Sequence, residues 1–204
     1  MARPSERKEG ATMRATFVLA GVLACTFTAA LLSGPAHAQG YQEYSDCYRA
    51  TTDKSLTEKG VDICTRLIES GRWKGEDLAR LFNNRGLLYA KLDKLDLAIS
   101  DLSQALKNNP KDAHAYDNLG DVWYTRRDYD KAVVEYNNAI RVDPTFIGAY
   151  YNRGRTFEAM GNLRSARADY QAVLDMPSQD RAIDRWAKDR ARDALNRLNK
   201  VNLN

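Results

Sequence analysis

Residues 113–144 read AHAYDNLGDVWYTRRDYDKAVVEYNNAIRVDP, and they form the middle one of three similar units in this 204-residue chain. Gly120 lies 34 residues after Gly86 and 34 residues before Gly154. A self-similar period of this length is typical of an array of stacked helical hairpins. Each hairpin in such an array contacts only its neighbours, and the stacked hairpins together form an extended surface. Such an array is usually a binding surface and rarely a catalytic centre.

The same residue types recur around each glycine. A second small residue follows twelve positions later (Ala98, Ala132 and Ala166), and it allows two antiparallel helices to approach closely. Prolines that cannot continue a helix close the units. Aromatic residues and prolines complete the pattern, namely Phe82, Tyr89, Pro110, Tyr116, Trp123, Tyr136, Pro144, Tyr150, Phe157, Tyr170 and Pro177.

This pattern resembles the tetratricopeptide repeat (TPR) family in three successive units. The units start at Ala79, Ala113 and Ile147. Arg85 and Arg153 depart from the family pattern, which usually has leucine there, and Val173 stands where alanine is expected. We expect these departures to weaken individual contacts only.

The resemblance implies an all-α fold, a right-handed TPR superhelix with three helix-turn-helix repeats. The expected repeats are 79–112, 113–146 and 147–178, with helices at 79–92, 95–108, 113–126, 129–142, 147–160 and 163–175. A degenerate hairpin and loop are expected within 39–76, with helices at 42–53 and 56–70. Residues 179–204 predict a C-terminal capping helix and tail, because an apolar stripe that includes Trp186 underlies a densely charged face. A helix that binds a membrane or a partner is the alternative for this segment.

The N-terminus predicts export. Basic residues precede an apolar run from Phe17 to Leu32, and the small-x-small site Ala36–Ala38 follows. This arrangement indicates a signal peptide at 1–38, cleaved after Ala38, and a periplasmic or secreted protein. Either Met1 or Met13 could be the true start. Two alternatives remain open, a lipoprotein anchored through Cys25 and an uncleaved membrane anchor.

Two cysteines, Cys47 and Cys64, remain after such a cleavage. An even pair in an oxidising compartment suggests a disulfide, and on the repeat template both positions face the interior of the first hairpin. Buried free thiols or a redox cysteine are the alternatives. The period is also four residues too long at Gly71–Gly75, which predicts a loop around Trp73. Trp73 either folds back onto the first hairpin or is exposed as a contact residue.

The residue inventory argues against catalysis. Without residues 1–38 the chain keeps a single histidine, His114, so a His-based metal site or a Cys–His pair has no support. No Gly-rich phosphate loop is present, and we expect no enzyme activity, cofactor, metal or small-molecule substrate. Nucleic acid is not an expected partner, because that part of the chain has 27 basic and 25 acidic residues and no basic stripe.

The candidate binding surface is the inner wall. In TPR folds the first helix of each pair lines a concave groove, and Asn84, Asn118 and Asn152 recur there two residues before each glycine. They resemble the asparagine ladder that binds an extended peptide in some TPR proteins, since a carboxamide offers both a donor and an acceptor. An ordinary repeat pattern is the competing interpretation. The further groove candidates are Asn83, Leu87, Lys91, Asp117, Asp121, Tyr124, Tyr151, Arg155 and Glu158, with His114 at the rim.

These observations predict a non-catalytic adaptor of the cell envelope that binds an extended segment of another envelope protein. Mixed charges and two tyrosines in the groove suggest a partner that is neither strongly acidic nor strongly basic. Asn83 and Leu87 replace the residues of the family's carboxylate clamp, so a chaperone C-terminus is not an expected partner. The alternative is a structural scaffold that acts through its convex face, the Trp73 loop or self-association.

Overall fold

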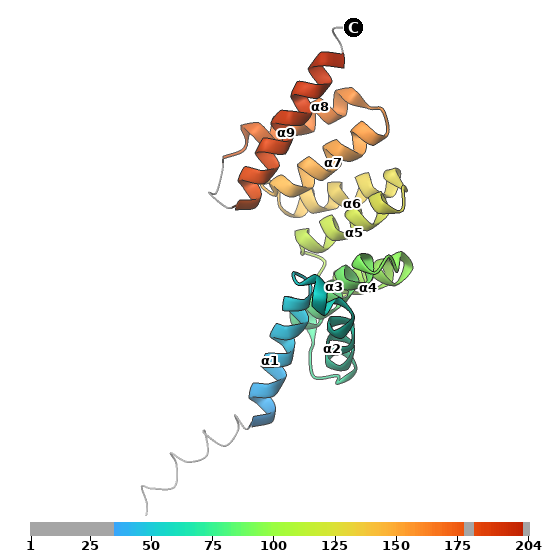
Figure 1. Ribbon diagram of the computed structural model, residues 1–204, viewed down its shortest axis with the longest axis vertical. Helices are drawn as coiled ribbons and strands as arrows, with labels where there is room; N and C mark the ends of the chain where they lie inside the picture. The colour runs from blue at the N-terminus through green and yellow to red at the C-terminus, as the bar shows by residue number, and fades with distance from the viewer. Residues whose placement is uncertain (1–34, 178–181, 202–204) are drawn as a thin grey trace, which may run out of the picture. The chain divides into compact units, whose positions relative to one another are not determined.

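A computed structural model of the protein describes residues 35–177 and 182–201, and every regular element within them is a helix (Figure 1). The all-α prediction is therefore confirmed. The elements are α1 (Pro35–Ala50), a 3-10 turn η1 (Lys54–Leu56), α2 (Thr57–Glu69), α3 (Gly75–Lys91), α4 (Leu95–Asn108), α5 (Ala113–Thr125), α6 (Tyr129–Val142), α7 (Ile147–Ala159), α8 (Leu163–Asp175) and α9 (Ala182–Val201). Apart from the first residues of α1, the helical hairpins lie within the unit Gly40–Asn204.

Helices α3 to α8 form three hairpins, α3–α4, α5–α6 and α7–α8, and each hairpin packs on the next one in chain order (Figure 1). The second helix of every pair has the bounds that the repeat pattern predicts. The third unit is followed by α9, which packs against α7 and α8. Helix α3 begins four residues earlier than predicted, and the acidic residues Glu76 and Asp77 in its first turn suit the positive end of the helix dipole.

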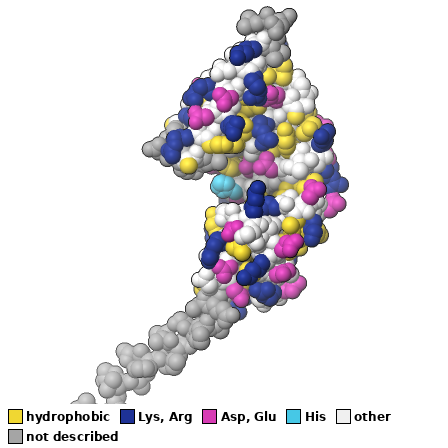
Figure 2. Space-filling view, in the orientation of Figure 1, with side chains coloured by type: hydrophobic (Ala, Val, Ile, Leu, Met, Phe, Trp, Pro, Cys, Tyr) yellow, Lys and Arg dark blue, Asp and Glu magenta, His cyan; other side chains and the backbone are white. Residues whose placement is uncertain are grey.

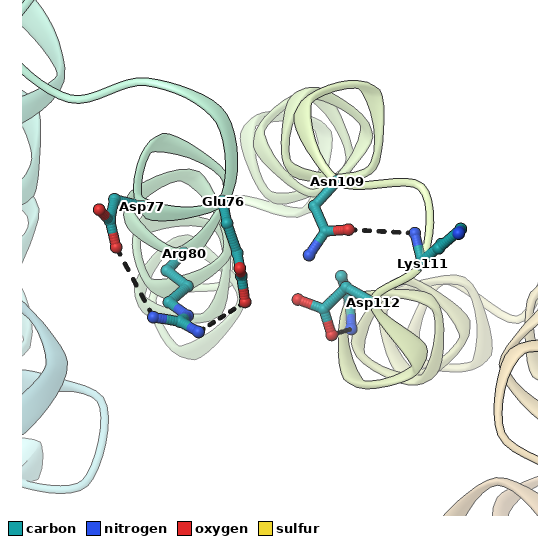
Figure 3. Close-up of polar contacts among 7 residues, drawn as sticks. Glu76, Asp77, Arg80, Asn109, Lys111 and Asp112 are labelled. Atoms are coloured by element: carbon teal, nitrogen blue, oxygen red, sulfur yellow. Dashed lines mark hydrogen bonds and ion pairs between the residues drawn. The ribbon is translucent and has the colours of Figure 1, made fainter.

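Short polar side chains fix where several of these helices begin. Asp112 Oδ1 accepts a hydrogen bond from the backbone N–H of Ala115 at 3.2 Å and so caps α5 (Figure 3). Asp128 and Asn162 cap α6 and α8 in the same way. A cap of this kind stabilises a helix by about 1 kcal/mol because the first N–H groups have no partner within the helix.

The turn inside each hairpin uses one left-handed residue. Asp93, Arg127 and Gly161 have φ values of 57°, 66° and 77°, and they lie 34 residues apart. Only the third of these positions carries glycine, although glycine adopts this conformation most readily. The turn geometry is therefore set by the repeat as a whole.

The predicted contact between each glycine and the alanine twelve residues later is seen for Gly86, where an added Cβ atom would lie 3.3 Å from the carbonyl oxygen of Ala98. Gly120 and Gly154 instead meet tyrosines of the paired helix. A Cβ atom on Gly120 would lie 2.5 Å from Cε1 of Tyr136, a fully buried side chain on the opposite helix α6. Gly154 meets Tyr170 in the same way, with a Cβ–Cε1 separation of 2.9 Å. The aromatic rings of α6 and α8 thus occupy the space that the glycines leave free.

Arg85 and Arg153, the two departures from the family pattern, form partly buried ion pairs. Arg85 donates from Nε and Nη2 to the two carboxylate oxygens of Asp101 on α4, at 2.7 and 2.9 Å. Its Nη1 reaches Thr65 on α2 at 3.0 Å. We expected Arg85 to weaken contacts, and this expectation is wrong at this position. The guanidinium on α3 hydrogen-bonds residues of both α2 and α4, which a leucine side chain cannot do.

The third repeat reproduces this arrangement. Arg153 binds Asp169 on α8 at 2.9 and 2.6 Å, and its Nη1 lies 2.5 Å from Oδ1 of Asn137 on α6. The middle repeat has Leu119 at the equivalent position, with 5% of its surface exposed. Two of the three units therefore join their helices by charge and one by apolar packing.

The N-terminal hairpin is held by a small core around two cysteines. Cys47 on α1 and Cys64 on α2 are both fully buried, and the structure joins them as a disulfide with a Cα–Cα distance of 5.2 Å. Trp73 is 8% exposed and packs beside Tyr44 at 4.8 Å between ring centroids. Of the two possibilities for Trp73, the structure shows the one in which the loop folds back onto the hairpin.

Helix α9 covers the end of the array. Ala187, Ala191 and Ala194 are buried against the third repeat. Trp186 was expected in the same buried stripe, but 46% of its surface is exposed, because it packs edge-on against Tyr151 at the margin of the contact. None of the helices in residues 35–177 and 182–201 has the length and hydropathy needed to cross a bilayer. The predicted signal peptide and Cys25 fall largely on residues 1–34, outside the described part of the chain.

Candidate functional site

The first helices of the three repeats lie side by side. Helix α3 contacts α5, and α5 contacts α7, so these three helices form one wall of the array. The asparagines that the sequence singled out are spaced along this wall, one from each helix. We call α3, α5 and α7 the inner wall.

Each of the three asparagines donates a hydrogen bond to the preceding first helix. Nδ2 of Asn118 lies 2.8 Å from Oδ1 of Asn83, and Nδ2 of Asn152 lies 3.1 Å from Oδ1 of Asp117. Asn84 makes the weakest contact of this kind, to Sγ of Cys47 on α1 at 3.9 Å. The three asparagines therefore connect successive hairpins, and each uses one of its two amide protons to do so.

The three asparagines differ in their access to a ligand. Asn118 and Asn152 are half-buried, whereas Asn84 has only 6% of its surface exposed. A buried carboxamide cannot pair with the backbone of a bound segment. We therefore keep Asn118 and Asn152 as candidate groove residues and leave Asn84 out.

A cavity of about 360 Å³ opens where the inner wall meets the capping helix. It brings together residues of α5, α7, α9 and the loop before α7. Figure 2 shows a histidine side chain beside acidic and basic side chains at a notch on this side of the molecule. The cavity is lined by His114, Asp117, Asp121, Phe146, Gly148, Asn152, Arg155, Asp184 and Trp186.

Two carboxylates one helical turn apart dominate the floor of this cavity. Asp117 accepts from Asn152, and Asp121 accepts from the hydroxyl of Tyr136 at 2.8 Å. Burial, together with the repulsion from Asp121, raises the pKa of Asp117 to about 8. Burial also raises the pKa of Asp121. Each carboxylate is held in place by a neutral donor, so the pair retains an unsatisfied negative charge when ionised.

One cation stands beside these carboxylates. The guanidinium of Arg155 lies over the ring of Tyr124 on α5, 4.8 Å from the centroid, and its Nη1 is 3.5 Å from Oδ1 of Asn152. It lowers the pKa of both aspartates but does not cancel the effect of their burial. Arg155 is therefore already engaged by the inner wall.

Several other predicted groove residues are engaged with the protein itself. Tyr151 is 9% exposed and packs against Tyr170 and Trp186. Glu158 accepts from Tyr170 at 2.8 Å and from Arg197 on α9 at 3.1 Å. The α9 helix thus closes the groove at the end of α7. Leu87 is half-buried on α3, while Lys91 donates to the backbone carbonyl of Thr51.

The structure adds residues that the sequence did not assign to the site. Phe146 lies in the loop before α7, and its ring is 4.6 Å from that of His114. Trp186 and Asp184 come from α9 and line the cavity from the opposite side. A capping helix occupies the place of a further repeat, so its first turns should face the inner wall. That argument could have assigned Trp186 to the groove from the sequence.

Family comparisons agree with this architecture. Residues 79–112 and 147–180 each match a sequence profile described as "Tetratricopeptide repeat", and residues 124–161 match one described as "TPR repeat". The chain contains tetratricopeptide repeats. The profile matches coincide with the first and third hairpins and overlap the second.

Curated proteins match part of this chain. The lipoprotein NlpI homolog of Haemophilus influenzae is 35% identical over 110 residues, which is 54% of this chain and 35% of that protein. The human serine/threonine-protein phosphatase 5 is 31% identical over 93 residues, which is 46% of this chain and 19% of that protein. The chain therefore spans about a third or less of the length of these relatives.

Solved TPR structures share the fold. The crystal structure of MamA matches with a TM-score of 0.55 at 24% identity, over 63% of this chain and 72% of that one. YrrB, described as a TPR protein with an unusual peptide-binding site, matches with a TM-score of 0.55 at 23% identity, over 67% of this chain and 68% of that one. At these identities the likeness establishes the stacked-hairpin architecture.

Proposed function

We propose that this protein is a non-catalytic adaptor that binds an extended segment of a partner protein along α5 and α7. The observation that carries the proposal is the pair of half-buried carboxamides on the inner wall, Asn118 and Asn152. Asn152 also lines the 360 Å³ cavity. Each uses one amide proton for the preceding helix. The second amide proton of each side chain and the Oδ1 atom of Asn118 remain as groups that can bind a peptide unit, while Oδ1 of Asn152 accepts a long hydrogen bond of 3.5 Å from Arg155.

Two further observations support a protein segment as the ligand. Tyr124 on α5 is half-buried on this wall, and an aromatic side chain gives a large contact area at a small entropic cost. TPR neighbours of the same fold bind peptides, as the description of YrrB states for that protein. The alternative of a scaffold that uses an exposed Trp73 loses its contact residue, because Trp73 is buried.

Export to the cell envelope is part of the proposal. It is supported by the basic, apolar and small-residue pattern of residues 1–38 and by similarity to a relative named as a lipoprotein. Cleavage after Ala38 predicts a chain that begins at Gln39, whereas lipidation at Cys25 would leave a longer, acylated chain. The intact mass of the protein purified from its native envelope distinguishes the two.

The groove is tested by selection from a display library of random dodecapeptides. The wild-type protein should enrich a family of peptides, and the Asn118→Ala/Asn152→Ala variant should bind the enriched peptides about tenfold or more weakly, because two hydrogen bonds to the peptide backbone are lost. The matched control is Asn196→Ala/Asn199→Ala, which removes two exposed carboxamides from α9. Equal peptide affinity of the wild type and the groove variant, with both proteins folded by circular dichroism, would refute the proposal.

A further inference from the structure

The asparagine period continues onto the capping helix with a different residue type. Trp186 on α9 lies 34 residues after Asn152, just as Asn152 lies 34 residues after Asn118. Asn118 and Asn152 each bind the residue 35 positions before them. The ring of Trp186 packs on the ring of Tyr151, which is also 35 positions before it, with 5.2 Å between the centroids. Trp186 therefore extends the row of asparagines by one position and makes the equivalent contact.

The ring of Trp186 is held in place by the protein and is still open to a ligand. Tyr151 packs edge-on against it, and the guanidinium of Arg190 lies 6.0 Å from its centroid. Even so, 46% of the surface of Trp186 is exposed. An indole has no acceptor to offer to a peptide unit, so the exposed part of this ring suits a side chain of the bound segment better than its backbone.

The cavity beside Trp186 has further aromatic residues in its wall. Phe146 is half-buried and packs against His114, with 4.6 Å between the ring centroids. The Phe146 ring also lies against Gly148, where an added Cβ atom would be 3.2 Å from its Cε2 atom. Asn152 lines the same cavity, which is therefore continuous with the proposed peptide path. Its volume of about 360 Å³ is at the small end of ligand cavities and accommodates one aromatic or large aliphatic side chain.

The polar groups on the floor of this cavity already interact with other residues of the chain, namely Asp117, Asp121, Asn152, Arg155 and Asp184. Burial and the neighbouring Asp121 raise the pKa of Asp117 to about 8, so Asp117 is largely neutral at pH 7. The charge of Asp121 interacts with the guanidinium of Arg155. A charged side chain would lose its water here without gaining an unengaged counter-charge, whereas an apolar side chain leaves these internal contacts intact.

We propose that Trp186 and the cavity beside it bind an aromatic or large aliphatic side chain of the partner segment, next to the stretch of backbone that Asn152 binds. Trp186 is then a specificity-determining residue of the groove, and α9 is part of the binding site as well as a cap. The inference rests on the proposed function, because the side chain belongs to the peptide that the inner wall binds. It agrees with the expectation of a partner that is neither strongly acidic nor strongly basic.

The peptides selected by the wild-type protein test the inference. We expect them to share an aromatic or large aliphatic residue at one position. Replacing that residue by alanine in a synthetic peptide should weaken binding to the wild type about tenfold or more, because most of a buried apolar side chain is lost. Isothermal titration calorimetry measures both dissociation constants.

The matching protein variants change Trp186 alone. Trp186→Ala removes the ring, and Trp186→Gln removes it while keeping a longer side chain against Tyr151. Both should bind the parent and the alanine peptide within about threefold of each other, whereas Trp186→Phe, which keeps an aromatic ring, should retain most of the wild-type preference. The control Tyr48→Ala removes an aromatic side chain that is 61% exposed on α1 and does not line the cavity, so it should keep the full preference.

The outcomes separate this inference from the proposed function. Enriched peptides with no shared apolar position, or a preference unchanged in Trp186→Ala and Trp186→Gln, would overturn the role of Trp186 and leave the groove in place. A library that yields no enriched peptide at all would overturn the groove and this inference together. A shared apolar position whose advantage disappears in both variants supports the inference.

Discussion

The ion pair between Arg85 and Asp101 gives a sharp prediction about what holds neighbouring helices together. Both side chains are withdrawn from water, with 15% and 7% of their surfaces exposed, and two charge-assisted hydrogen bonds of 2.7 and 2.9 Å join them. Arg85→Leu introduces the residue type that the middle repeat has at this position. It leaves the carboxylate of Asp101 buried without its partner.

The expected cost follows from that geometry. Breaking a fully buried pair from one side destabilises a protein by about 3–5 kcal/mol. Since part of the Arg85 guanidinium still contacts water, we expect a loss near the lower end, about 3 kcal/mol, in the free energy of unfolding. Arg85→Leu/Asp101→Leu removes both charges and should cost less than about 1.5 kcal/mol, because well-packed apolar residues can replace a buried pair.

Urea unfolding followed by far-UV circular dichroism measures these free energies for the wild type, both single variants and the double variant. The resulting cycle should give a coupling energy above about 1.5 kcal/mol between the two residues, because Arg85→Leu alone costs about twice as much as the double variant and Asp101→Leu adds a cost of its own. The exposed pair Arg192–Asp189 on α9 is the matched control and should show less than about 1 kcal/mol. A loss below about 1 kcal/mol for Arg85→Leu, or a double variant as unstable as the single ones, would refute the reasoning.

Three further predictions concern packing, the disulfide and pH. Gly120→Ala places a methyl group about where Tyr136 lies, 2.5 Å from its Cε1 atom, and should lower the free energy of unfolding by about 1–3 kcal/mol in thermal melts; an unchanged melting temperature would contradict this. Cys47→Ser/Cys64→Ser opens a bridge between residues 17 positions apart and should cost about 3 kcal/mol, with no further loss on adding dithiothreitol to the variant. For Asp117, burial and its neighbouring carboxylate raise the folded-state pKa to about 8, whereas the unfolded chain ionises near pH 4. The folded state therefore binds the proton more tightly, so stability should fall as pH rises from about 4 to about 8, by up to about 1.4 kcal/mol per unit, and Asp117→Asn should reduce this slope; identical slopes in both proteins would argue against it.

The repeat period was enough to predict the hairpins, for a physical reason. Gly120 on α5 leaves room for the fully buried ring of Tyr136 on α6, so a small residue followed by an aromatic residue at this spacing indicates that the two helices pack together. The bounds of the second helices followed directly, since a turn with a left-handed residue precedes each of them. The start of α3 did not follow, because its first turn lies outside the repeating unit and depends on local capping and charge.

The site was less accessible to sequence reasoning. Asn118 and Asn152 could be assigned to the inner wall from their period, but their hydrogen bonds to α3 and α5 depend on how far successive repeats rotate. The partnership of Arg85 with Asp101 joins residues 16 positions apart on antiparallel helices and appears in sequence only as a departure from the family pattern. Trp186 reaches the cavity because α9 ends the array, and a repeat alignment that stops at the third unit does not include it.

The central claim is that α5 and α7 bind an extended segment through their inner face. Nuclear magnetic resonance of the ¹⁵N-labelled protein, titrated with a peptide selected from the display library, tests it most directly. The account predicts that the side-chain amide resonances of Asn118 and Asn152 and the indole resonance of Trp186 shift with one common dissociation constant, while backbone resonances on the outer faces of α4 and α6 stay in place. Saturable shifts confined to the outer helices, with those three side chains unmoved, would contradict it.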